Sequence, residues 1–75
     1  GPEELRELLD AVLRGVFDGD LAVALDRAAA FCRVVSAGRA STSEGEGSAT
    51  LAADLLTTAG DLAAAAAAWR RGELD

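Results

Sequence analysis

Few residues of this chain have side chains suited to acid–base or nucleophilic chemistry. His, Lys and Tyr are absent, so the titratable groups are carboxylates, arginines and the single thiol of Cys32. A cysteine nucleophile is usually activated by a neighbouring histidine or another base, and this sequence offers no histidine. A lone cysteine also forms no internal disulfide. We therefore expect Cys32 to be a small apolar residue of the core.

A group of carboxylates near the amino terminus is the second candidate for chemistry. Glu3, Glu4, Glu7 and Asp10 could act as paired acids and bases or bind a cation. None of them lies in the middle of an apolar stripe, where burial would raise its pKa. We therefore expect a solvated helix face here.

Other chemical motifs are missing as well. No His/Cys cluster has zinc-ligand spacing, the acidic residues at 44–46 lack the EF-hand pattern, and GEGS lacks the P-loop ending. The sequence therefore predicts that the protein is not an enzyme. It predicts no catalytic residue, no cofactor and no metal site.

Charge and hydropathy exclude further classes. The formal net charge is −6, and the seven cations, all Arg, are scattered. Binding to nucleic acid or to anionic lipid needs clustered positive charge, so we expect neither a nucleic-acid nor a membrane partner. No apolar run approaches about 18 uncharged residues, so no membrane span is expected. No secretory signal is visible, and we expect a cytoplasmic protein.

The composition also bears on origin and domain organisation. Ala, Arg, Gly and Leu are abundant, whereas Lys, Asn, Ile and Tyr are absent. This bias indicates GC-rich coding and suggests a high-GC bacterium such as an actinomycete. The start at Gly1-Pro2, without Met, indicates a protease-cleavage scar left by cloning. We therefore expect residues 3–75 to be one small domain, taken from a larger parent protein.

The first two expected helices form a hairpin. Residues 3–18 carry apolar side chains at i, i+3, i+4, i+7, i+8, i+11 and i+12, the spacing of an amphipathic helix. Gly19 can end this helix in a left-handed conformation, and Asp20 can cap the next one. The second helix is expected over 20–37, ended by Gly38. So short a connection makes the pair antiparallel.

A polar loop, 38–48, and a third helix, 48–71, complete the expected fold. The loop contains two capping-box patterns, Ser41-x-x-Glu44 and Ser43-x-x-Glu46. The apolar phase of the third helix does not reset at Gly60, which favours one continuous helix at a cost of about 1 kcal/mol. A break at Gly60, giving four helices, is the alternative.

Together these elements predict an all-α fold, a small three-helix bundle. The third helix is expected to pack across both helices of the hairpin. Half of the residues are hydrophobic, but many of these are alanine, which contributes little burial per residue. We therefore expect the bundle to be completed by dimerisation.

The preferred function is a non-catalytic protein–protein interaction module: a docking, adaptor or oligomerisation domain of a larger bacterial protein. Apolar side chains outside the main stripes form surplus surface, and Trp beside Arg is common at binding hot spots. The expected partner is another protein or a second copy, as a homodimer. Megasynthase docking domains are similar in size and composition. The predicted partner-binding residues are Val23, Arg27, Ala30, Val34, Leu56, Ala63, Trp69 and Arg70.

Three alternatives remain. One is a helical bundle that binds a small molecule in a pocket lined by Phe17, Phe31, Cys32 and Trp69. Another is an acidic regulator that sequesters a basic partner on its first helix. The third follows from a resemblance: Gly19-Asp20-Leu21, followed by Ala24 and Ala28, resembles the second helix of a tetratricopeptide unit. That resemblance implies a tetratricopeptide-like helical pair.

Overall fold

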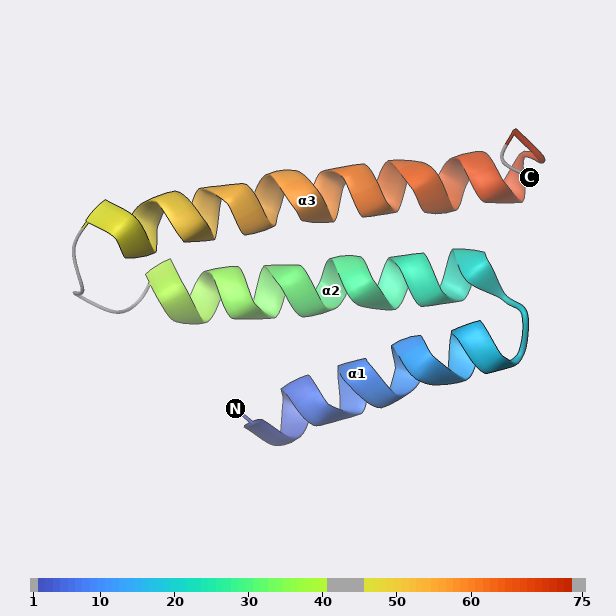
Figure 1. Cartoon of the computed structure of the whole chain (residues 1–75), viewed down its shortest axis with the longest axis horizontal. Helices are drawn as coiled ribbons and strands as arrows, with labels where there is room; N and C mark the ends of the chain where they lie inside the picture. Colours follow the sequence, from blue (N-terminus) through green and yellow to red (C-terminus); the bar gives the residue numbers. More distant parts are fainter. Residues whose placement is uncertain (1, 41–45, 74–75) are drawn as a thin grey trace.

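Three helices make up the computed structural model, which describes residues 2–40 and 46–73. They are α1 (Pro2–Phe17), α2 (Leu21–Ala40) and α3 (Glu46–Arg70). Each helix runs antiparallel to the one before it (Figure 1). The described residues contain no strand. The predicted all-α fold is confirmed, and α3 continues through Gly60 without a break.

The helices lie side by side with α2 in the middle. α2 packs against both α1 and α3, whereas α1 and α3 do not pack against one another within the described ranges. The Cα extents are 41 × 25 × 11 Å, so the molecule is about one helix layer thick (Figure 1). The expectation that the third helix packs across both helices of the hairpin is therefore wrong. The two neighbours occupy different sides of α2, which keeps them apart.

A Schellman motif ends α1, as the Asp-Gly-Asp turn predicts. The Asp20 amide donates to the Gly15 carbonyl at 2.9 Å and the Gly19 amide to the Val16 carbonyl at 3.1 Å. Gly19 has a φ of 75°, the left-handed conformation that favours glycine. The Asp20 carboxylate then accepts a hydrogen bond from the Val23 amide at 3.2 Å and caps α2.

The carboxyl end of α2 differs from the expected one. Gly38 lies inside the helix, which continues to Ala40, and is not a left-handed cap. A single glycine costs a helix only about 1 kcal/mol, and Arg39 and Ala40 after it are strong helix formers. The two capping-box serines, Ser41 and Ser43, fall outside the described residues. At the other end of α3, Gly72 closes the helix with a φ of 76°, as expected.

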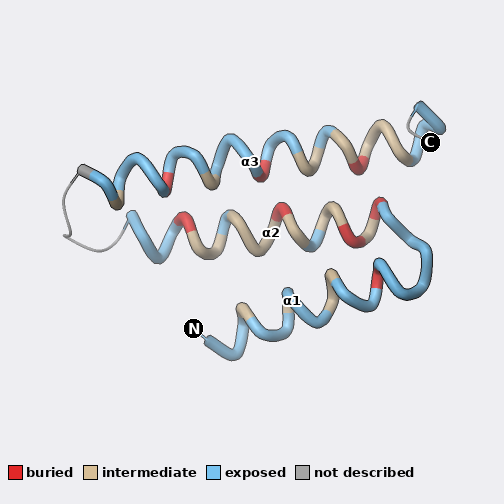
Figure 2. The backbone as a smooth tube through the Cα atoms, in the orientation of Figure 1, coloured by how far each residue is buried: buried red, intermediate tan, exposed pale blue. Residues whose placement is uncertain are grey.

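A seam of small residues joins α2 to α3. Its members recur every seven residues on each helix and are almost completely buried (Figure 2). The Ser36 hydroxyl donates to the Ala52 carbonyl at 2.7 Å and fixes the register of the two helices. Because the helices are antiparallel, this register places Ala29 opposite Ala59. The seam consists of Ala22, Ala29 and Ser36 on α2 and Ala52, Ala59 and Ala66 on α3.

Gly15 sets the distance between α1 and α2. It is the one buried residue of α1, and a β-carbon built on it would lie 2.8 Å from the Ala24 backbone nitrogen. The two backbones therefore approach more closely than any larger residue would permit. Both helix interfaces thus depend on small residues, and no large side chain is fully buried in the described chain.

Candidate functional site: two unlike faces of a helical layer

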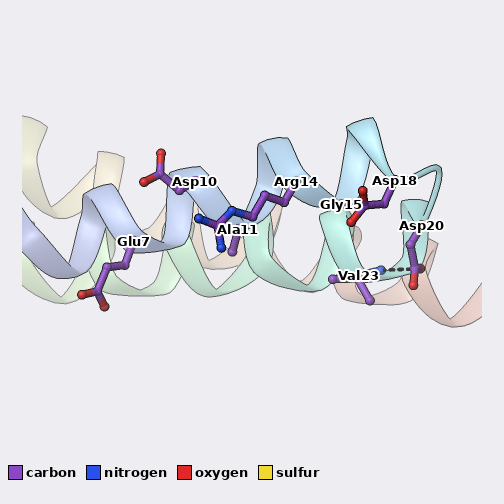
Figure 3. Close-up of a pocket in the computed structure, with 8 residues that line it drawn as sticks. All are labelled: Glu7, Asp10, Ala11, Arg14, Gly15, Asp18, Asp20 and Val23. Carbon is purple, nitrogen blue, oxygen red and sulfur yellow. Dashed lines mark hydrogen bonds between the residues drawn. The ribbon is translucent and has the colours of Figure 1, made fainter.

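A layer of three helices presents two broad faces, and grooves identify the first. A groove of about 500 Å³ opens between α1 and α2 (Figure 3). Glu7, Asp10 and Arg14 of α1 line it, together with Asp18 of the turn and Val23 of α2. The charged side of α1 and the Val23 side of α2 therefore belong to one face, which we call the groove face.

The groove face continues onto α3. Asp26, one turn from Val23 on α2, accepts a hydrogen bond from the Arg70 guanidinium at 2.6 Å. Arg70 follows Leu56 and Ala63 at intervals of seven, so these three residues share one side of α3. A groove of about 310 Å³ between α2 and α3 is also lined by Leu56. The Asp26–Arg70 pair thus joins the Val23 side of α2 to the Leu56 side of α3.

The opposite face is apolar on all three helices. Leu25 lies about 200° around α2 from Val23, because successive residues turn by about 100°. The same geometry places the leucines of α1 opposite its acidic side. On α3, one side of the helix carries Leu51, Leu55, Leu62 and Trp69, and Leu56 lies on a different side. We call this the leucine face: Leu9, Leu13 and Val16 of α1, Leu21, Leu25 and Cys32 of α2, and Leu51, Leu55, Leu62 and Trp69 of α3.

Several large side chains of the leucine face are exposed. The exposed fractions are 49% for Leu9, 47% for Leu13 and 52% for Val16 on α1. Leu21 of α2 and Leu51 of α3 are exposed as well. Scattered apolar residues are normal on a protein surface, but a contiguous apolar patch is typical of a binding site. The charged residues that line the first groove lie on the other side of the layer.

The predicted partner-binding residues divide between the two faces. The α2 members lie on the groove face, where Val23, Ala30 and Val34 are half-buried and Arg27 is exposed. Leu56, Ala63 and Arg70 extend that face onto α3, and Leu56 is 55% exposed. Trp69 lies on the leucine face and is half-buried. Their role in binding stays a prediction.

The sequence reasoning missed the exposed leucines of α1. The amphipathic spacing of residues 3–18 places Leu9, Leu13 and Val16 on one apolar stripe and does not predict their exposure. Among the described helices α1 packs only against α2, so the side of the stripe that turns away from α2 stays exposed. A signal was present: seven apolar positions in α1 span more of the helix circumference than one neighbouring helix can cover.

The residues proposed to line a small-molecule pocket are not gathered around either groove. Phe17 is 83% exposed at the end of α1. Trp69 lies on α3, which does not pack against α1. Cys32 is a free, half-buried thiol on the leucine face, whereas both grooves open on the groove face.

Ionisable groups with a shifted pKa lie at the end of α3. The hydrogen bond that Arg70 donates to Asp26 raises the pKa of Arg70, with a smaller contribution from Coulomb attraction to Asp26 and Asp20. The hydrogen bond between Arg71 and Glu73 raises the pKa of Arg71 and lowers that of Glu73. All these groups are solvent-exposed, which is typical of surface ion pairs. Residues 2–40 and 46–73 hold no group of three or more acidic, Cys or His side chains placed to bind a metal.

α3 also has the length and composition of a membrane span. Over Gly47–Arg70 it is apolar enough to cross a bilayer, and 17% of the most apolar window is buried in the fold. Core helices of soluble proteins can be equally long and apolar, but they are mostly buried. α3 is covered by α2 along its small-residue seam and is exposed over most of its remaining surface.

Comparison with known proteins adds no relative. No protein-family model, no curated protein and no solved structure matches the chain. The tetratricopeptide resemblance of the Gly19–Ala28 segment therefore has no support from these comparisons.

Proposed function

We propose that the protein is a non-catalytic protein–protein interaction module that binds through its leucine face. The observation that carries this proposal is the separation of the two faces. Large apolar side chains such as Leu9, Leu13 and Val16 are exposed on one side of the layer, and the charged residues of α1 gather on the other. A stable domain usually has two packed layers of secondary structure around a core, and this chain supplies one.

Burial of these side chains supplies a driving force for association. Full burial of an exposed leucine or valine contributes about 1.5–3 kcal/mol, so several of them can offset the entropy lost on binding. Trp69 lies among them, and tryptophan is enriched among residues that dominate binding energy. The half-buried Leu25 and Leu62 continue the apolar surface between the exposed leucines.

A lipid bilayer is a weaker candidate for the same face. Amphipathic helices that lie on membranes usually carry Lys and Arg on their polar side, whereas Glu7, Asp10 and Asp18 line the groove face here. The net charge of −6 also opposes binding to anionic lipid. As a span, α3 would bring exposed Asp54 and Asp61 into the hydrocarbon, at roughly 2.5–3.5 kcal/mol for an aspartate at the centre of a span.

A photo-crosslinking experiment in the source cells tests the proposal. A photoreactive phenylalanine analogue replaces Leu13 on the leucine face or Leu56 on the groove face. These two exposed leucines form a matched pair, with 47% and 55% exposure. We expect discrete protein adducts from position 13 and markedly fewer from position 56.

Other results would contradict the proposal. Adducts that form only from position 56 would assign binding to the groove face. Lipid adducts from position 13 would assign the leucine face to a membrane. Absence of any adduct from position 13 would remove the interaction function from this face.

A further inference from the structure

We infer that the leucine face is covered by a second copy of this chain, so that two single-layer molecules form a two-layer, six-helix dimer. This inference rests on the proposed function and adds the identity of the partner. Three properties of the described molecule support it: the area left exposed, the position of the charges, and the shape of the layer.

The exposed area matches what one copy can cover. The solvent-accessible surface of the chain is 5053 Å². A folded monomer of 7.6 kDa is expected to expose about 4300 Å². The difference of roughly 750 Å² is close to the ~800 Å² that each partner buries in an interface of standard size. A two-fold dimer with an interface of standard size would therefore cover an area equal to this surplus.

The charge distribution permits two identical acidic chains to meet. Two copies with a net charge of −6 each repel one another, unless their acids stay away from the contact. The carboxylates of Glu7, Asp10 and Asp18 line the opposite groove. Asp26 forms an ion pair with Arg70 on the same groove face. When two leucine faces pair, their uncharged centres are in contact and the acidic side chains of both copies stay on the outer faces.

The uncharged centre of the leucine face favours self-association over a foreign partner. Interfaces between different proteins commonly use complementary charges to select the partner and to exclude others. The centre of the leucine face carries aliphatic side chains, Cys32 and Trp69. Arg39, seven residues after Cys32, lies at the carboxyl end of α2 and outside this centre. A flat apolar layer is complementary to its own copy, because the second molecule supplies the second layer of helices.

Molar mass in solution tests the inference on the full chain. Sedimentation equilibrium from low micromolar to millimolar protein is expected to show twice 7.6 kDa at the upper end. Leu9→Glu, on the leucine face, is expected to shift the chain to monomer over this range. Leu56→Glu is the matched control on the groove face, with comparable exposure, and should stay dimeric.

Cys32 provides a second readout that needs no substitution. It is the one cysteine of the sequence, half-buried on the leucine face. Its alkylation rate in the wild type is expected to fall several-fold as protein concentration rises through the dimerisation range. If circular dichroism shows that Leu9→Glu has lost helicity, the Cys32 alkylation rate of the wild type still tests whether the leucine face is covered by dimerisation.

The outcomes separate the two proposals. A wild type that remains at 7.6 kDa with a concentration-independent Cys32 alkylation rate overturns self-association. The interaction function is then judged by the crosslinking at position 13, where an adduct to a different protein would support it. A dimer that Leu56→Glu dissociates and Leu9→Glu leaves intact overturns the assignment to the leucine face.

Discussion

Gly15 of α1 and Ala24 of α2 approach so closely that a β-carbon on Gly15 would lie 2.8 Å from the Ala24 backbone nitrogen. We predict that Gly15→Ala lowers the free energy of unfolding by about 1–3 kcal/mol, because backbone must move to make room. Alanine is the better helix former by about 1 kcal/mol, but this gain is smaller than the packing loss. Chemical denaturation at a fixed protein concentration measures the difference.

The control for this change is Gly60→Ala on α3. A β-carbon at Gly60 would meet nothing within 4 Å, so only helix propensity changes. The free energy of unfolding should rise by up to about 1 kcal/mol. Equal stabilisation by both substitutions would show that α1 and α2 do not approach as described.

Ala59→Leu tests the small-residue seam between α2 and α3. Ala59 is 1% exposed, opposite Ala29 in the register of the two helices. A leucine there forces the helices apart, and we expect a loss of about 1–3 kcal/mol or more in the free energy of unfolding. Ala64→Leu, on the exposed side of the same helix, should change stability by less than about 0.5 kcal/mol. Thermal and chemical unfolding of both variants measure these changes. An equally small effect of both substitutions would contradict close packing along the seam.

Ser36→Ala tests the hydrogen bond that fixes the register. The Ser36 hydroxyl is buried and donates to the Ala52 carbonyl at 2.7 Å. Its removal should cost about 0.5–1.5 kcal/mol, the usual net value of such a bond. Thr57→Ala removes an exposed hydroxyl that bonds the Ala53 carbonyl within α3 at 3.2 Å. This control should cost less, and a larger effect at Thr57 than at Ser36 would contradict the prediction.

Glu73 should titrate below its ordinary pKa of 4.5, because its carboxylate accepts hydrogen bonds from Arg71. A lowered pKa in the folded state means that the contact stabilises the end of α3 above pH 4.5. This stabilisation is lost as the pH falls through the lowered value. An NMR titration of the Glu73 carboxyl carbon measures it, with Arg71→Gln as the control that restores the ordinary pKa. An unshifted Glu73 in the wild type would refute the contact.

Local signals in the sequence were sufficient for the elements themselves. The Asp-Gly-Asp turn predicts the left-handed Gly19 and the Asp20 cap, since these features depend on neighbours within a few residues. The unbroken apolar phase correctly predicts the continuous α3. The predicted end of α2 at Gly38 was wrong, because a glycine can stop a helix or lie within it at modest cost.

The packing of the helices was harder to foresee, because the residues that direct it are alanines. Ala29 and Ala59 are completely buried, whereas large leucines such as Leu9 and Leu13 are not. A hydropathy pattern ranks leucine above alanine and therefore assigns the leucines to the core. The seven-residue recurrence of small side chains on α2 and α3 was visible in the sequence, but only their pairing across two helices reveals its role.

The peripheral position of α1 has a consequence for unfolding. Because α1 packs against α2 and not against α3, it can detach while the α2–α3 pair stays closed. Amide hydrogens of α1 should then exchange with solvent through this partial opening, ahead of those along the seam. Leu9, Leu13 and Val16 leave the apolar face when α1 detaches, so a molecule bound there would hold α1 in place and slow its exchange.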